Sequence, residues 1–154
     1  MTIGTTMTAG VTWASETVGN KVWNILGQTY MPKQLCDSSF SWFATLPPGT
    51  FVPPHYHPTQ DEFVYVLEGQ FDLWLDGKEG KATPADLIRL PMGIPHGLFN
   101  KSDKPIHCLF WVSPTRLLWD LFNQLDNVPD PNEVVRIAAE HEVFFLPPPE
   151  TKSA

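Results

Sequence analysis

Proline is the residue that most restricts the fold of this chain. The sequence has 16 prolines among its 154 residues, about twice the usual frequency of roughly 5%. Several stand together, as Pro47-Pro48, Pro53-Pro54 and Pro147-Pro148-Pro149. A proline has a fixed φ and no backbone N–H, so it disrupts the interior of helices and central strands. Because these prolines punctuate the apolar runs and are expected to lie outside them, the sequence predicts many short strands joined by tight turns.

Short apolar runs bounded by turn residues predict where the strands lie. Asp76-Gly77 is typical of a two-residue hairpin, and Leu67-Glu68-Gly69-Gln70 indicates another turn. The clearest predicted strands are 21–26, 40–46, 62–67, 71–75, 86–90 and 106–112, and 142–146 is a further candidate. No helical pattern separates them and no internal repeat is present. We therefore expect an all-β fold with one closed or double-sheet barrel over roughly residues 20–112.

The hydrophobic period changes to that of a helix after the barrel. Ser113 is a predicted N-cap, followed by Pro114 at the first helical position. A second helix is predicted to begin at Asp130 and Pro131, with Glu133 at capping-box spacing. The residues predicted to line the two helices are Leu118, Leu121, Phe122 and Leu125, then Val134, Ile137, Ala138 and His141. We expect both helices to pack on the barrel, in a C-terminal extension over roughly residues 113–146.

Composition excludes several classes of function. The length suits one domain, 1–154, with a core that needs no disulfide. A net charge of −7 without a basic patch argues against nucleic-acid binding. No apolar stretch is long enough for a membrane span or a signal peptide, so we expect a cytoplasmic protein. Cys36 and Cys108 are then expected to be free thiols. The residues after 150 are expected to form a frayed tail.

Two histidines and a glutamate near the middle of the chain predict a metal site. His55 and His57 are two residues apart, so in an extended strand both side chains point to the same face. Pro58 ends that strand, and an antiparallel return would bring Glu62 back to the same ion. Two imidazoles and one carboxylate with open positions are the ligands of non-haem iron sites and of some catalytic zinc sites.

The spacing of these residues continues into two longer motifs. Gly49, His55, His57, Glu62 and Gly69 form the first; the second has Pro91, Gly93, His96 and Asn100, with Ala85 where a leading glycine is usual. Together they resemble the cupin superfamily, which implies a single jelly-roll β-barrel. The resemblance also implies His96 as a further ligand, so that His55, His57, Glu62 and His96 hold one divalent transition metal. Iron, manganese, cobalt, nickel, copper and zinc all suit this ligand set.

Strand phase predicts what surrounds the ion. With Glu62 inward, Val64 and Val66 also point inward, which makes the pocket mostly apolar. Such a pocket suits a small hydrophobic or aromatic substrate. The face of strand 106–112 that lines the pocket stays open. His107 as a packed or surface histidine is favoured over His107 as a ligand, and a Cys108 thiolate ligand is less favoured still.

The segments around the motifs resemble quercetinase-like cupins, through residues 53–57, 62–69 and 90–97 and the helix after Pro114. That resemblance implies a dioxygenase that cleaves a phenolic or enolisable substrate with dioxygen. Glu62 is then the candidate catalytic residue, either as a ligand alone or also as a proton acceptor. Two alternatives stay open: a non-oxidative lyase, isomerase or cyclase acting on a polyketide-like aromatic, and a cupin that binds a small molecule without turnover. A further alternative is a cupin that keeps these ligands but uses the metal only to stiffen the barrel. The resemblance favours a homodimer.

Overall fold

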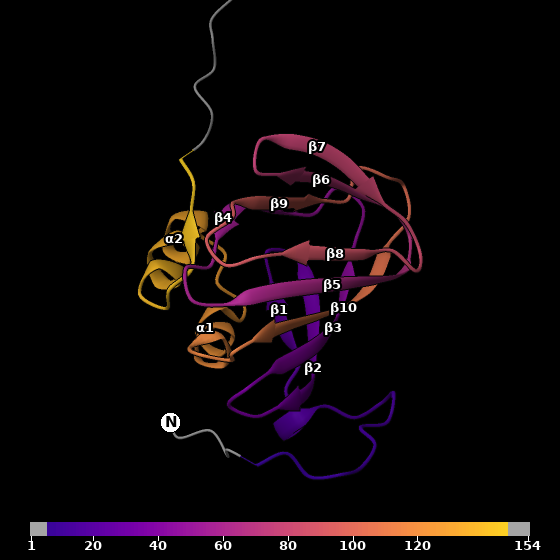
Figure 1. Cartoon of the computed structure of the whole chain (residues 1–154), viewed down its shortest axis with the longest axis vertical. Coiled ribbons are helices and arrows are strands. Elements are labelled where there is room, and N and C mark those ends of the chain that lie inside the picture. Colours follow the sequence, from indigo (N-terminus) through magenta and orange to yellow (C-terminus); the bar gives the residue numbers. More distant parts are fainter. Residues whose placement is uncertain (1–5, 148–154) are drawn as a thin grey trace, which may run out of the picture.

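Two antiparallel sheets face each other, and two helices cover one open end of the barrel that they form (Figure 1). This computed structural model describes residues 6–147. The six-stranded sheet contains, in spatial order, β1 (Trp23–Ile25), β2 (Gln28–Leu35), β3 (Phe40–Leu46), β10 (Ile106–Ser113), β5 (Asp61–Glu68) and β8 (Leu87–Leu90). The five-stranded sheet contains β11 (Phe144–Phe145), β4 (Phe51–Tyr56), β9 (His96–Phe99), β6 (Phe71–Leu75) and β7 (Lys78–Ala82). The predicted jelly-roll barrel is confirmed.

Alternating burial along the strands builds the core between the sheets. In β3, Phe40, Trp42, Ala44 and Leu46 point inward, and the residues between them are only partly buried. The inward face of β10 carries Ile106, Cys108, Phe110 and Val112. The face of β10 that points into the barrel, which the sequence left open, is therefore the one that carries Cys108 and not His107. Val64 and Val66 of β5 are fully buried, as predicted, while Tyr65 and Leu67 point outward.

The helices are confirmed as elements, but the first begins later than predicted. Ser113 is the last residue of β10, and α1 spans Leu118–Leu125 with Leu117 as its N-cap. The predicted N-cap at Ser113 is therefore wrong, because this residue continues the sheet ladder opposite Asp61. The second helix, α2, spans Pro131–Ala139, and the Asp130 side chain caps it by accepting a hydrogen bond from the Asn132 N–H. A 3-10 turn, η1 (Val18–Asn20), precedes β1.

The helices pack their apolar sides over the barrel opening. Trp119 and Phe122 of α1 meet Trp23 of β1 with ring centroids 5.0 and 5.5 Å apart. Val134 and Ala138 are the buried residues of α2. Neither helix in residues 6–147 has the length and apolar character that a membrane-spanning helix needs. The predicted frayed tail lies outside the described residues.

Prolines enter the strands more often than predicted. Pro32 lies inside β2, and Pro53 and Pro54 lie inside β4. Both places are irregular: the register of β2 shifts between Pro32 and Gln34, and that of β4 shifts between Val52 and His55. A bulge leaves one residue without a ladder partner, so it tolerates a residue that has no N–H. The expectation that prolines lie outside strands is thus wrong for these three.

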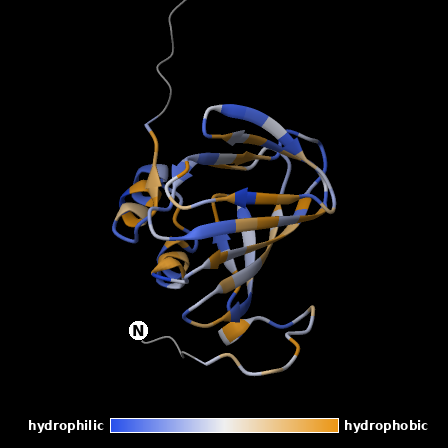
Figure 2. Cartoon of the chain, viewed as in Figure 1, coloured by the Kyte–Doolittle hydropathy of each residue, from blue (hydrophilic) through white to orange (hydrophobic). Residues whose placement is uncertain are grey.

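The sequence does not predict three of the strands, β2, β7 and β9, because none of them has an uninterrupted apolar run of strand length. β2 is interrupted by Pro32, and β9 has only four residues. β7 is Lys-Glu-Gly-Lys-Ala, a mostly hydrophilic strand at the edge of its sheet (Figure 2). It exists because it continues the predicted Asp76-Gly77 hairpin, in which both turn residues have positive φ, 49° and 84°. The pairing, and not the composition, makes β7 a strand.

Ala85 takes over the conformation of the glycine that it replaces in the second motif. Its φ is 74°, in the left-handed region that disfavours residues with a Cβ. The Ala85 N–H donates to the Val66 carbonyl, and the Val66 N–H donates to the Asp86 carbonyl. The turn into β8 is thus closed by backbone hydrogen bonds with Ala85 in place, and the four predicted ligands still converge.

Gly69→Ala is expected to lower the free energy of unfolding by more than about 2 kcal/mol. Gly69 has a φ of 89°, and an added Cβ would lie 2.8 Å from the backbone oxygen of Pro105. Gly77→Ala is the matched control, because its φ is 84° but no atom of the described residues lies within 4 Å of the added Cβ. We expect only about 1–2 kcal/mol there. Urea denaturation compares the two, and equal losses would contradict the steric argument.

Candidate metal centre

Four buried side chains from both sheets converge inside the barrel. His55 lies near the end of β4, His57 directly follows that strand, Glu62 lies at the start of β5, and His96 begins β9. Their ligand atoms lie within 4.8 Å of one another, and none of the four residues is more than 5% exposed. All four residues that the sequence predicts as ligands are thus brought together. The five-residue separation of His57 and Glu62 works because residues 58–60 turn the chain from one sheet into the other.

The distances within this cluster suit a small cation at its centre. Glu62 faces two imidazoles, with 3.4 Å from its Oε1 to His96 Nε2 and 3.6 Å from its Oε2 to His57 Nε2. His55 and His96 are directly paired across β4 and β9, and their ring centroids are 4.3 Å apart. The carboxylate comes from the opposite sheet to these two histidines. Closing the barrel is therefore what completes the cluster.

Backbone carbonyls orient two of the imidazoles. His55 Nδ1 lies 2.8 Å from the Pro53 carbonyl oxygen, and His96 Nδ1 lies 3.2 Å from that of Ile94. A carbonyl only accepts, so in both rings Nδ1 carries a proton and Nε2 is the nitrogen that faces the cluster. The Nε2 atoms of His57 and His96 are buried and have no hydrogen-bond partner among residues 6–147. Buried imidazole nitrogens that converge in this way are the donors that a divalent transition metal uses.

The protonation states also fit a metal. Burial raises the pKa of Glu62, but the neighbouring imidazoles, His57 first, outweigh burial and lower this pKa to about 2. Burial is the main cause that holds the pKa of His55 well below its ordinary value, and the other two histidines add to it. The resting cluster therefore contains an ionised Glu62 and a neutral His55 imidazole. Metal ligands are used in these forms, so binding at these two residues needs no proton release.

A small, mainly apolar cavity lies beside the cluster. Its volume is about 50 Å³, and it reaches His55, His57 and Glu62. The sheets contribute Tyr30, Trp42 and Phe110 to its wall, and the helical cover contributes Leu121 and Phe122. Trp42 and Phe110 are stacked, with ring centroids 5.2 Å apart. The Tyr30 hydroxyl donates to the Gln28 side chain at 2.8 Å, so a polar group stands in this otherwise apolar wall.

The other chemically active side chains lie outside the cluster. His107 points away from the barrel interior, where its Nε2 lies 3.6 Å from Glu68 and its Nδ1 lies 3.2 Å from Thr45 Oγ1. The surface role preferred for His107 is thus confirmed. Cys108 points inward, but burial raises the pKa of its thiol and it is not among the clustered ligands. His141 follows α2, and its Nδ1 lies 2.8 Å from the Ile137 carbonyl oxygen.

Two residues near the cluster, Gln60 and Tyr30, are not predicted from the sequence. Gln60 is buried in the turn between His57 and Glu62, and its side chain lies 2.8 Å from His57 Nδ1. Its position inside the first motif was the available signal, since a polar residue in a buried turn needs partners. Tyr30 gave no signal, because β2 was not predicted.

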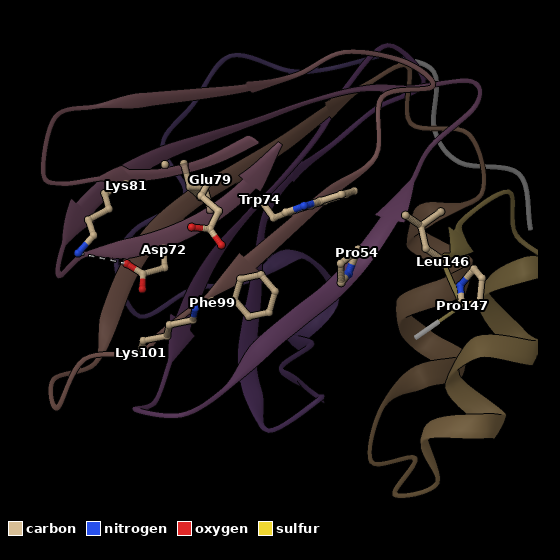
Figure 3. Close-up of a pocket in the computed structure, with 11 residues that line it drawn as sticks. Pro54, Asp72, Trp74, Glu79, Lys81, Phe99, Lys101, Leu146 and Pro147 are labelled. Atoms are coloured by element: carbon tan, nitrogen blue, oxygen red, sulfur yellow. Dashed lines mark ion pairs between the residues drawn. The ribbon is translucent and has the colours of Figure 1, made fainter. Parts of the chain in front are cut away.

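A larger hollow lies on the other side of the five-stranded sheet. It has a volume of about 570 Å³, and Trp74, Phe99 and Pro54 lie along it (Figure 3). Asp72 and Lys81 form an ion pair of 3.9 Å at one end, and Leu146 and Pro147 line the other. None of the described residues that line it is a histidine. On β9, Phe99 points into this hollow, whereas His96 and Leu98 point into the barrel.

Comparison with known proteins gives a consistent family. A family model described as "Cupin domain" matches residues 42–112, the part of the chain that carries all four clustered residues. Among solved structures, KdgF from Halomonas sp. has a TM-score of 0.63 at 19% identity. The superposition covers 71% of this chain and 96% of that one, and it concerns the fold alone.

The curated relatives include proteins of polyketide synthesis. "Polyketide synthase CurC" of Streptomyces cyaneus is 34% identical over 77 residues, which is half of each chain. "Tetracenomycin polyketide synthase protein TcmJ" of Streptomyces glaucescens is 30% identical over 95 residues, 62% of this chain and 63% of that protein. "Quercetin 2,3-dioxygenase" of Bacillus subtilis is 38% identical over 50 residues, 32% of this chain but only 15% of that protein. In each case the aligned part spans less than two thirds of the relative's length.

Proposed function

Because the chain belongs to the cupin superfamily, we propose that it is a metal-dependent enzyme that moves a proton on a small enolisable, polyketide-like aromatic substrate. One observation carries this proposal: three imidazoles and one carboxylate converge, buried, at the edge of an apolar cavity. The names of the relatives CurC and TcmJ support the substrate class. The proposed ligands are His55, His57, Glu62 and His96.

A divalent ion in this cluster would supply a Lewis acid that lowers the pKa of a substrate hydroxyl or of a carbon beside a carbonyl. Donors of three nitrogens and one oxygen accept iron, manganese, cobalt, nickel, copper or zinc. The chain's own part is to hold the ligands in one geometry. It does so by fixing His55 and His96 against backbone carbonyls.

Glu62 is the proposed proton acceptor. It is the one carboxylate of the cluster, and its pKa of about 2 keeps it ionised. As a ligand of a cation it would be a weak base, so it accepts a proton only from a group whose own acidity is raised in the site. In the proposed step the substrate C–H or O–H bond breaks, its electron pair stays on the substrate as an enolate or phenolate, and the proton moves to Glu62. Glu62 returns this proton when the product forms.

The cavity sets the size and character of the substrate. Its walls are mainly aliphatic and aromatic, and such walls select an apolar ring system. Its volume of about 50 Å³ is smaller than the roughly 150 Å³ that holds a benzene molecule. A substrate ring therefore enters only when the covering side chains of α1, such as Leu121 and Phe122, move aside. Exclusion of water after the cover closes would strengthen every charge interaction at Glu62.

Dioxygenase chemistry is the second candidate, supported by the similarity of 50 residues to quercetin 2,3-dioxygenase. The same cluster and the same class of substrate would serve it. It differs in needing dioxygen as a co-substrate. Binding without turnover is the third candidate, and in that case the metal would hold the ligand unchanged.

Elemental analysis followed by a paired substrate screen tests these candidates. The purified protein, loaded with each candidate metal, is incubated with polyketide-like 1,3-dicarbonyl aromatics and with flavonols, in air and under anaerobic conditions. We expect stoichiometric metal and a rate that does not depend on dioxygen. Turnover that stops without dioxygen, with uptake of dioxygen in air, would replace the proposal by the dioxygenase. Tight binding with no product in either atmosphere would leave the binding role.

A further inference from the structure

Gln60 joins a proposed metal ligand to the segment that leads into the helical cover. Its side chain is 3% exposed and has three partners. Its Oε1 lies 2.8 Å from His57 Nδ1, and its Nε2 donates to the carbonyl oxygens of Pro114, at 3.0 Å, and Thr115, at 2.7 Å. Every polar atom of this buried amide therefore has a partner.

The two carbonyl groups determine which way round the amide lies. Carbonyl oxygens only accept hydrogen bonds, so the amide NH₂ must face Pro114 and Thr115. The amide oxygen then faces His57, and an oxygen there accepts a hydrogen bond only from a protonated Nδ1. His57 is consequently a donor at Nδ1, and its Nε2 is the ring nitrogen that faces Glu62 and the other imidazoles. Unlike His55 and His96, this imidazole is oriented by a side chain.

We propose that Gln60 is a positioning residue that holds His57 as the Nδ1–H tautomer and so prepares its Nε2 for the metal. This inference rests on the proposed metal site, and it assigns to Gln60 a role that the motif residues do not have. Partners of the non-ligating ring nitrogen commonly change metal affinity by about 10- to 100-fold. The free imidazole in water prefers the other tautomer only weakly, so a single buried acceptor is enough to select one.

The segment that holds Gln60 is itself anchored. The Thr115 N–H donates to the Asp37 carbonyl, its hydroxyl donates to the Cys36 carbonyl, and its own carbonyl also accepts from the Leu118 N–H at the start of α1. A second hydrogen bond joins the turn of residues 58–60 to the segment after α2, since the Thr59 hydroxyl donates to Glu142 Oε2 at 2.9 Å. Among the described residues, the Thr59 side chain hydrogen-bonds to Glu142 and not to His57, so Thr59→Val is a matched control for anchoring alone.

Three variants separate positioning from anchoring. Gln60→Leu removes the acceptor and both donated bonds. Gln60→Glu keeps an acceptor for His57 but loses both donated bonds. Thr59→Val removes the hydrogen bond from Thr59 to Glu142 and leaves Gln60 in place. In each metal-free protein, ¹⁵N chemical shifts of the imidazoles report the tautomer of His57, and titration with Zn²⁺ or Co²⁺ gives the dissociation constant.

We expect the wild-type protein and Thr59→Val to show the Nδ1–H tautomer of His57 and dissociation constants within about threefold of each other. Gln60→Glu is expected to keep this tautomer and to bind metal at least as tightly as the wild type, because a carboxylate that accepts from Nδ1 raises the basicity of the ligand. Gln60→Leu is expected to lose that tautomer and to bind metal about 10- to 100-fold more weakly. The proposal is overturned if Gln60→Leu retains both properties, or if Gln60→Glu binds as weakly as Gln60→Leu, which would indicate anchoring alone. If Gln60→Leu does not fold, the wild-type protein decides: an Nε2–H tautomer of His57 in the metal-free wild type would overturn the proposal. A wild-type protein with the tautomer but without metal binding would refute the proposed function and leave the tautomer assignment standing.

Discussion

His55→Ala is expected to remove bound metal and turnover together. The imidazole is one of four buried donors, and the three that remain cannot close the same coordination sphere. Because loss of an outer partner of a ligand already costs about 10- to 100-fold in affinity, loss of a ligand is expected to exceed about 100-fold. Elemental analysis after dialysis and the rate with the best substrate of the screen measure the two effects.

His107→Ala is the matched control for this experiment. His107 is also a histidine on a barrel strand, but it lies on the outer face beside Glu68 and stacks on Phe43. It should retain full metal content and rate. Circular dichroism of the metal-free proteins shows whether His55→Ala still folds. A folded His55→Ala protein with stoichiometric metal would contradict the assignment of this residue as a ligand.

Glu62→Gln is expected to lower turnover per bound metal by about 10²- to 10⁴-fold, the usual contribution of a positioned acid–base group. Glutamine retains the length and an oxygen donor, but it cannot accept a proton from substrate. Metal affinity should fall as well, because the amide brings no negative charge to the cation. The two effects separate when the rate is divided by the metal content measured in the same sample.

Glu68→Gln controls for the loss of a carboxylate from β5. Glu68 lies on the same strand but is largely exposed and faces His107 outside the barrel. Glu68→Gln should leave the rate unchanged. If Glu62→Gln reaches the wild-type rate per bound metal, Glu62 is a ligand alone and the proton acceptor must be sought elsewhere in the cavity.

The homodimer and the cytoplasmic location that the sequence favours stay predictions.

Three of the four clustered residues were predictable because they are close in sequence and obey strand geometry. His55 and His57 share a face at a spacing of two, and Glu62 returns after a proline-ended strand. His96 is distant in sequence, and it was found through the second motif. Its cross-strand pairing with His55 explains why that motif has a histidine at this position. The inward phase of Val64 and Val66 followed from Glu62 by alternation alone.

The helix start and the proline positions were less predictable, because tertiary contacts override local signals there. Ser113 and Pro114 have the local signature of a helix start, yet β10 extends to Ser113 because its backbone pairs with Asp61. Pro32 stands within β2, where the register shift at Gln34 leaves room for it. The residues around Pro114 do not identify β5 as the partner of β10, and the residues around Pro32 do not identify β3 as the partner of β2.

The tryptophans show the same limit. Trp23, Trp42 and Trp119 are buried around the barrel opening, whereas Trp13 is 62% exposed and Trp74 lines the outer hollow. All are equally apolar in the sequence. Only the packing of α1 over β1 distinguishes a core residue such as Trp23 from a surface one.

By itself, the sequence determined three of the converging side chains, His55, His57 and Glu62, and the short-stranded barrel that holds them, because ligand spacing, strand alternation and turn chemistry act over a few residues. The fourth, His96, came from the family resemblance of the second motif. The tertiary structure alone decided what surrounds them. Gln60 becomes a partner of His57 only because the Pro114–Thr115 carbonyls arrive from a segment more than 50 residues away. Burial of the cavity likewise depends on α1 and α2 folding back over the opening. Such contacts depend on chain segments that local patterns do not relate to one another.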